Sequence, residues 1–140
     1  MDSSNATYSG FQFEDNGHPA VAIINSDLKN FSDKSDYNYS VFIEIIPDVY
    51  NEMGHPEGAE YDQLTKIEKE IIEYLEGQTK SVHIGHTTAY RKREIIFYTG
   101  EPEQVRSFLN YFLAESGRET FFEIESDPAW EDVSGFYEQL

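Results

Sequence analysis

SVHIGHTTAYRKREIIFYT, residues 81–99, contains two runs of strand-forming residues separated by a short, mostly basic connection. The runs Ser81–Ala89 and Glu94–Thr99 are rich in β-branched and aromatic side chains, which favour strands. The connection Tyr90-Arg91-Lys92-Arg93 is too short for a crossover, so the two strands must pair antiparallel. The rest of the fold is predicted outward from this hairpin.

An amphipathic helix is predicted on each side of the hairpin. The helix before it covers Ala59 to Glu76, where apolar residues recur every three or four positions, and Gly77 is its natural C-terminal stop. Glu101-Pro102 begins the helix after it, because proline is well tolerated at the first helical position, and Gly117 ends it. The apolar faces are Tyr61, Leu64, Ile67, Ile71, Ile72 and Leu75 in the first helix, and Val105, Phe108, Leu109, Phe112 and Leu113 in the second.

Two more strands are predicted outside the helices, at Tyr39–Ile46 and Thr120–Glu125. From Tyr39 to Glu125 the order is therefore β-α-β-β-α-β. Right-handed crossovers in both β-α-β units place the first and third of these strands side by side in the centre of the sheet. The predicted fold class is α+β: a ferredoxin-like two-layer sandwich with an added N-terminal β-hairpin and a short C-terminal helix.

The two ends of the chain add these extra elements. Asn16-Gly17 lies between two apolar runs and supplies the positive φ angles of a tight hairpin turn, so the N-terminal hairpin either extends the sheet or covers its helix-free face. Asp127-Pro128 combines a capping carboxylate with a proline at the start of a terminal helix, which Trp130 anchors to the sheet. Residues 1–9 are polar and are expected to be disordered. We expect one domain over residues 1–140.

The composition is that of a folded, strongly acidic chain. The 39% hydrophobic and 15% aromatic residues supply enough apolar surface for one core. The 27 acidic and 10 basic residues give a formal charge of -17, which repels nucleic acid and anionic membranes and attracts basic protein surfaces. Nucleic acid and membrane are therefore not expected partners, whereas a basic protein is; the simpler interpretation is that the charge only prevents aggregation.

Few chemical motifs are present. The absence of cysteine excludes disulfides, thiol nucleophiles and thiolate metal sites. No phosphate-binding glycine loop, nucleophile elbow, zinc-protease motif or calcium loop is found, so no cofactor, no metal and no catalytic residue is predicted. The residues favour a protein that is not an enzyme, although they do not decide the question. A cytoplasmic location is expected, because the N-terminus lacks a signal-peptide pattern and no apolar run is long enough to span a bilayer.

Residues 83–94 nevertheless contain the candidate functional side chains. His83 and His86 form an H-x-x-H pair, but residues three apart on a regular strand point to opposite faces, so they cannot share a metal unless the strand is bulged. His86, Thr88 and Tyr90 share one face, together with either Phe97 or Tyr98 of the paired strand. If that face is open they line a groove; if it is covered they belong to a polar-edged core. The full candidate binding surface is His86, Thr88, Arg91, Arg93, Glu94, Tyr98 and Trp130.

Short motifs in the C-terminal two thirds of the chain are similar to a known family. Gly85-His86-Thr87-Thr88, then Arg93-Glu94 before Phe97-Tyr98, then Asp127-Pro128-Ala129-Trp130 occur in the order and approximate spacing of bacterial domain-of-unknown-function family 695. Gly54-His55-Pro56 before the long acidic helix resembles that family too. The resemblance implies no activity. Some family members are fused to a domain similar to ribonuclease E regulator B, a ferredoxin-like inhibitor protein, and this association suggests a binding module.

Two main functional hypotheses follow, beside a third in which the chain is a purely structural subunit of a larger assembly and carries a large exposed apolar patch. The first is a non-catalytic interaction or regulatory module whose acidic surface binds a basic protein. The second is a small-molecule-binding domain or enzyme with a groove around His86, Thr88, Arg93 and Tyr98, with His86 as the acid or base; it fails if His86 is packed away from any cavity. Oligomeric state cannot be predicted from these residues.

Overall fold

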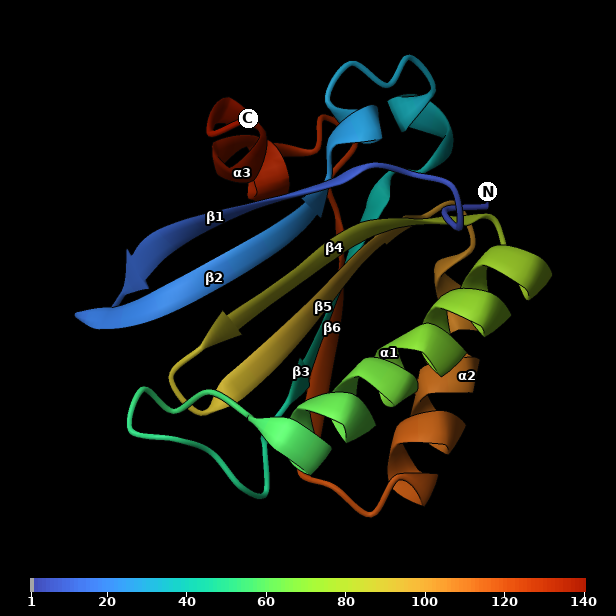
Figure 1. Cartoon of the computed structure of the whole chain (residues 1–140). Coiled ribbons are helices and arrows are strands. Elements are labelled where there is room, and N and C mark those ends of the chain that lie inside the picture. The colour runs from blue at the N-terminus through green and yellow to red at the C-terminus, as the bar shows by residue number, and fades with distance from the viewer. Residues whose placement is uncertain (1) are drawn as a thin grey trace.

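The computed structural model describes residues 2–140, which form a six-stranded antiparallel sheet with three helices (Figure 1). The predicted α+β class is confirmed. The strands are β1 (Tyr8–Asp15), β2 (His18–Asn25), β3 (Tyr39–Ile45), β4 (Ser81–Ala89), β5 (Lys92–Thr99) and β6 (Thr120–Ser126). The helices are α1 (Gly58–Gln78), α2 (Pro102–Glu115) and α3 (Ser134–Glu138), and single 3-10 turns occupy Ser26–Leu28, Lys34–Asp36 and Glu131–Val133.

The strand order is β1-β2-β4-β5-β3-β6, and every neighbouring pair is antiparallel. β3 pairs with β5, as the sequence predicted, and both are interior strands. The N-terminal hairpin extends the sheet, because β2 pairs with the outer edge of β4. Its turn is the predicted Asn16-Gly17, with φ of 51° and 83°.

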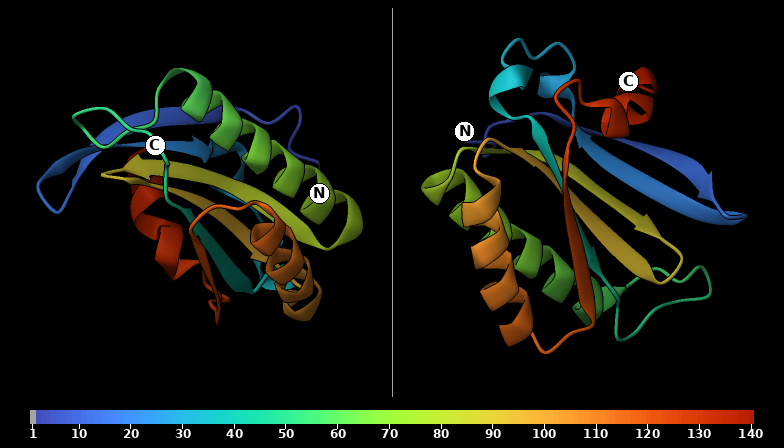
Figure 2. Two further views of the ribbon diagram at one scale, coloured as in Figure 1. Left: turned by 90° about the horizontal axis from the view of Figure 1, so that it is seen from below. Right: turned by 180° about the vertical axis from the view of Figure 1, so that it is seen from behind.

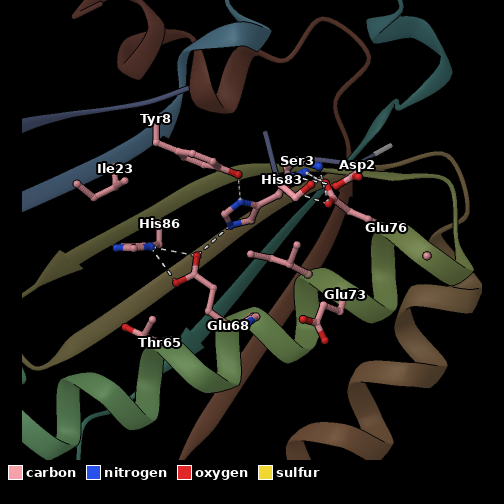
Figure 3. Close-up of a pocket in the computed structure, with 14 residues that line it drawn as sticks. Asp2, Ser3, Tyr8, Ile23, Thr65, Glu68, Glu73, Glu76, His83 and His86 are labelled. Carbon is pink, nitrogen blue, oxygen red and sulfur yellow. Dashed lines mark hydrogen bonds and ion pairs between the residues drawn. The ribbon is translucent and has the colours of Figure 1, made fainter. Parts of the chain in front are cut away.

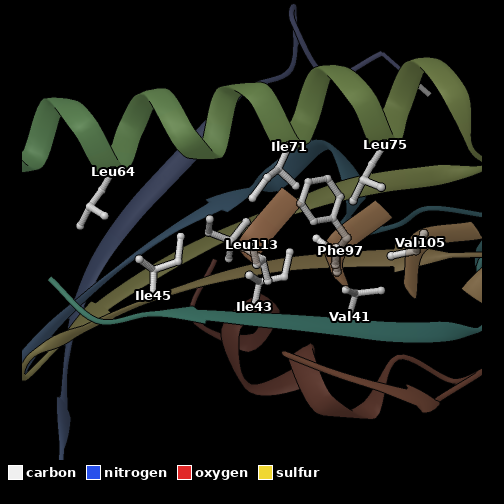
Figure 4. Close-up of a cluster of buried hydrophobic side chains, with 11 residues drawn as sticks. Val41, Ile43, Ile45, Leu64, Ile71, Leu75, Phe97, Val105 and Leu113 are labelled. Carbon is white, nitrogen blue, oxygen red and sulfur yellow. The ribbon is translucent and has the colours of Figure 1, made fainter. Parts of the chain in front are cut away.

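Helices α1 and α2 lie on one face of the sheet, and α3 lies on the other (Figures 1 and 2). The first core fills the space between the sheet and the two long helices (Figure 4). Its buried members include alternate residues of β3 and residues of α1 spaced by seven and four, the two periodicities of a strand face and a helix face. They are Val41, Ile43, Ile45, Leu64, Ile71, Leu75, Ile95, Phe97, Val105, Leu109 and Leu113.

A second core packs α3 and its preceding turn against the opposite face. Trp130 is 2% exposed, stacks on Tyr98 at 4.4 Å between ring centroids, and donates from Nε1 to the carbonyl oxygen of Tyr37 at 2.8 Å. Trp130 therefore joins the C-terminal segment to the sheet. No helix among residues 2–140 is both long and apolar enough to cross a membrane.

Several predicted boundaries were wrong. The turn between β4 and β5 is only Tyr90-Arg91, because Arg91 adopts the left-handed conformation (φ 61°) and Lys92 already pairs with Ala89. Helix α1 continues through Gly77, and the backbone N–H of Thr79 donates to the carbonyl oxygen of Leu75 at its end. The terminal helix starts at Ser134, not at Pro128.

Two polar contacts hold the segments around α1 in place. At its N-terminal end, Glu60 binds Arg118 through two hydrogen bonds of 2.9 and 2.6 Å, and this pairing lowers the pKa of the Glu60 carboxyl to about 2. At its C-terminal end, Glu76 accepts from the N–H and hydroxyl of Ser3 at 3.0 and 2.8 Å. Residues 2–4 thus lie beside the helix, next to the pocket described below.

Candidate functional site

An irregularity in β4 brings the two histidines of the H-x-x-H pair to the same face of the sheet. His83 is opposite Phe97 and Gly85 is opposite Ile96, so Ile84 is an extra residue in the strand. His86 therefore points to the same side as His83, toward α1. In a regular strand the two histidines would point to opposite faces. The bulge in β4 turns them to the same face, which is the exception expected from the sequence for a bulged strand.

Glu68 of α1 lies between the two histidines (Figure 3). Its carboxylate oxygens are 2.9 Å from Nε2 of His83 and 2.8 Å from Nδ1 of His86. A guanidinium nitrogen of Arg93 lies 3.4 Å from Glu68, and the Arg93 side chain is fully buried. On the far side of His83, its Nδ1 is 2.6 Å from the hydroxyl of Tyr8. Residues of β1, α1, β4 and β5 thus contribute to one polar cluster, defined here as Tyr8, Glu68, His83, His86 and Arg93.

Glu68 is the negative centre of this cluster. Burial alone would raise the pKa of its carboxyl, but the hydrogen bonds and charges of His83 and His86 lower the pKa far below its ordinary value. Because an ionised carboxylate only accepts hydrogen bonds, both facing ring nitrogens carry hydrogens. The neutral form of His83 then accepts at Nδ1 the hydrogen that Tyr8 donates. Burial, with the nearby charges of Glu76 and Glu68, raises the pKa of Tyr8 to about 12, so Tyr8 keeps that hydrogen.

A pocket of about 750 Å³ opens beside the cluster, between α1, the strands β2 and β4, and residues 2–4. One stripe of α1 forms a wall, because its residues recur at three- and four-residue spacing. Ile23, Ile72 and the Tyr8 ring make much of the pocket surface apolar, while His83 and His86 provide polar groups. The α1 residues in this stripe are Thr65, Glu68, Lys69, Ile72, Glu73, Glu76 and Gly77.

The structure separates the seven candidate residues: three lie on the α1 face of the sheet, three on the opposite face and one at the turn between β4 and β5. His86, Thr88 and Arg93 lie on the α1 face, where Arg93 Nε also donates to the hydroxyl of Thr88 at 3.2 Å. The predicted groove cannot include Tyr98, because Phe97 faces α1 and alternation turns the next side chain to the opposite face. The others are separated too: Glu94 and Trp130 lie on the face opposite α1, and Arg91 lies exposed at the turn over the Tyr50 ring.

The face opposite α1 carries carboxylates over β5, β3 and β6. They surround a hollow of about 360 Å³ lined by Ser40, Phe42, Glu94, Glu123, Glu125 and Asp132. Burial, together with neighbouring carboxylates, raises the pKa of Glu94 above its ordinary value. Tyr98 lies deeper on this face and donates to Asp127. This second site is acidic, whereas the first is apolar with a polar cluster.

No group of three or more His, Cys, Asp or Glu residues with an arrangement suited to a metal ion occurs in the described part of the chain. Arg93 also places a fixed positive charge beside Glu68, so a metal ion would have to compete with Arg93 for the Glu68 carboxylate. The cluster is better suited to hydrogen bonding, and both His83 and His86 line the pocket.

Comparison with known proteins identifies a family. Residues 10–137 match the model of a family described as "Family of unknown function (DUF695)". The chain belongs to this family. The comparisons with curated proteins and with solved structures found no match. Family membership therefore agrees with the resemblance read from the motifs and assigns no activity. Within this member of the family, Gly85-His86-Thr87-Thr88 forms the bulged part of β4 beside the pocket, and Arg93 lies against Glu68.

Sequence reasoning did not find Tyr8 or Glu68. Glu68 had a usable signal: it lies four residues after Leu64 and three before Ile71, on the buried stripe of the helix, where an unpaired carboxylate is costly. Gly85 was a second signal, because a glycine inside a strand often marks a bulge. Tyr8 had none, since its contact with His83 joins residues 75 positions apart.

Proposed function

We propose that this protein binds a small molecule in the pocket between α1 and the strands β2 and β4. The observation that carries the proposal is the buried Glu68–His83–His86 cluster on the floor of an apolar-walled pocket. Its volume of about 750 Å³ is within the range of ligand pockets, which combine apolar walls with a few convergent polar groups. Buried charges stabilise a fold little compared with apolar packing, so their position beside a cavity favours a binding role.

A pocket-filling variant tests this proposal. Thr65 is exposed and lines the pocket, so Thr65→Trp fills it without disturbing the core; Glu70→Trp puts the same side chain on an exposed position of α1 outside the pocket. In a fragment screen read by protein NMR, we expect hits to shift signals of pocket residues in wild type and in Glu70→Trp but not in Thr65→Trp. Hits that bind Thr65→Trp equally well, or a screen without any hit at the pocket, would contradict the proposal.

A second function, a module that binds a basic protein, is favoured by the acidic face opposite α1. Glu123 and Glu125 are exposed there beside Glu94, and the chain carries a formal charge of -17. Such a surface would speed encounter with a basic partner and make the association sensitive to salt. The two functions use different faces and do not compete.

Charge reversal on the face opposite α1 distinguishes binding by that specific surface from a general effect of the net charge of the chain. The variant Glu123→Lys/Glu125→Lys alters the acidic hollow, and Glu70→Lys/Glu115→Lys makes the same charge change at exposed helix positions. In pull-downs from native lysate eluted with rising salt, we expect a basic partner retained by wild type and by the helix variant but lost from the strand variant. Equal loss from both variants would show only a net-charge effect.

For the fold, we propose that β3, α1, β4, β5, α2 and β6 form a ferredoxin-like core. The order β4-β5-β3-β6 with every neighbouring pair antiparallel, and the two helices on one face, support this assignment. Such a core is compatible with either function, because fold alone does not determine activity. A cytoplasmic location also stays a prediction.

A further inference from the structure

His86 is the histidine of the polar cluster whose ring nitrogens are not both hydrogen-bonded; one guanidinium nitrogen of Arg93 is also unpaired among the described residues, but it is buried. Its Nδ1 is 2.8 Å from Glu68, whereas its Nε2 makes no hydrogen bond with any of residues 2–140. Figure 3 shows this second nitrogen on the side of the ring away from Glu68. By contrast, both ring nitrogens of His83 are used, one by Glu68 and one by Tyr8. His86 also lines the pocket, so Nε2 is the nitrogen available to a bound molecule.

The contact with Glu68 determines what His86 can do. Because the ionised carboxylate accepts the hydrogen on Nδ1, the neutral ring presents Nε2 as an acceptor. A carboxylate that fixes the tautomer and orientation of a histidine is the arrangement by which proteins present a ring nitrogen to a ligand. A molecule that meets Nε2 must therefore carry a hydrogen-bond donor.

The rest of the pocket sets the polarity of the molecule. Its body would contact Ile23, Ile72 and the Tyr8 ring. Beyond them, Glu76 lies eight residues along α1 from Glu68, a rise of about 12 Å. Asp2, Glu73 and Glu76 line that distant end, and Lys69 is the pocket's one lysine or arginine among the described residues. An anionic ligand would meet repulsion from these carboxylates.

We propose that the pocket takes a small, mainly apolar molecule that carries a hydrogen-bond donor and no negative charge, and that the donor binds Nε2 of His86. A hydroxyl or an ammonium group meets this requirement; a carboxylate or a phosphate does not. The inference rests on the proposed function, since it specifies the ligand class of the same pocket.

Four probes of one shape test the ligand class. 2-Phenylethanol carries a neutral donor, 2-phenylethylamine a cationic donor, 2-phenylethyl methyl ether no donor, and 3-phenylpropanoate a negative charge. In NMR titrations of the full chain, we expect the alcohol to bind roughly tenfold more tightly than the ether, because the ether leaves Nε2 unpaired. We expect the amine to show the same advantage over the ether and the anion to bind most weakly.

The variant His86→Asn tests the residue. An Asn amide N–H can replace the Nδ1–H that Glu68 accepts, but nothing replaces Nε2, so the fold should be retained and the preference lost. We expect the alcohol and the ether to bind this variant with affinities within about twofold of each other, the spread expected once the single hydrogen bond is absent. In wild type, the imidazole nitrogen spectrum should show His86 protonated at Nδ1 and an Nε2 signal that moves with the alcohol and not with the ether.

The outcomes separate the two proposals. If the probes shift pocket signals but the ether binds wild type as tightly as the alcohol, or the anion binds most tightly, the ligand class is wrong and the pocket function stands. A preference for the alcohol that survives in His86→Asn would overturn the role of His86. If none of the four probes shifts pocket signals at millimolar concentration, both proposals fail.

Discussion

Replacing Glu68 with Gln should lower the free energy of unfolding by about 3–5 kcal/mol, the usual cost of removing one partner from a buried ion pair. Glu68 and Arg93 have side chains only 7% and 0% exposed, so Arg93 would be left in the core without its counter-charge. The Gln amide would also point hydrogens at donors on His83, His86 or Arg93. Urea unfolding followed by circular dichroism measures the loss. Glu70→Gln on the exposed side of α1 is the control, with an expected change within about 0.5 kcal/mol.

A double variant distinguishes loss of charge pairing from loss of packing. Glu68→Met/Arg93→Met removes both charges and should be less destabilised than the sum of its two single variants, because each single variant leaves the other charge of the ion pair unpaired and the double variant does not. Additive effects would mean that the ion pair is unimportant.

The pKa of the Glu68 carboxyl is lowered below its ordinary value of 4.5 in the folded state. Its contribution is therefore complete well above pH 4.5 and is lost as pH falls below that value toward the lowered pKa, so the gap between wild type and Glu68→Gln should shrink in acid.

The elements of the fold were predictable because their signals are local. Spacing of three and four identified α1 and α2, and Asn16-Gly17 identified the first hairpin. The adjacency of β3 and β5 followed from the handedness of two crossovers. The place of the N-terminal hairpin was left open, since pairing between β2 and β4 joins segments more than 60 residues apart and nothing local in either strand selects that edge.

The candidate site was only partly predictable because it depends on non-local contacts. The structure places three of the selected residues, His86, Thr88 and Arg93, as neighbours on one face. Tyr98 was grouped with them because either Phe97 or Tyr98 could share the face of His86 and Thr88. Strand alternation cannot decide between the two until the pairing register of β4 and β5 is known. The bulge at Ile84 shifts that register, and Glu68 comes from a helix that contacts β4 only in the folded chain. A single extra residue thus decides whether His83 and His86 form one site or none.

Gly85→Ala should destabilise the protein by roughly 3 kcal/mol or more, the combined effect of backbone strain and steric overlap in a packed sheet. Gly85 has φ of 147°, which residues with a side chain rarely adopt. A Cβ there would overlap the carbonyl oxygen of Ile23 in the neighbouring strand, and backbone cannot move aside as a flexible side chain can. Thermal unfolding measures the loss. Gly77→Ala is the matched control, because its Cβ would meet no atom within 4 Å, and alanine inside a helix should stabilise by about 0.5–1 kcal/mol.

The location of the damage in Gly85→Ala is as informative as its size. Gly85 pairs with Ile24, next to Ile23, which lines the pocket from β2. If the overlap pushes β2 away from β4, hydrogen exchange should rise first in β1 and β2, while β3, β5 and β6 stay protected. The Tyr8–His83 contact would be lost with β1, and the small-molecule probes should bind more weakly even below the unfolding temperature. If the variant were as stable as wild type, the bulge in β4 would not require glycine. The geometry of the bulge could then not be what holds the hairpin, the two histidines and the pocket together.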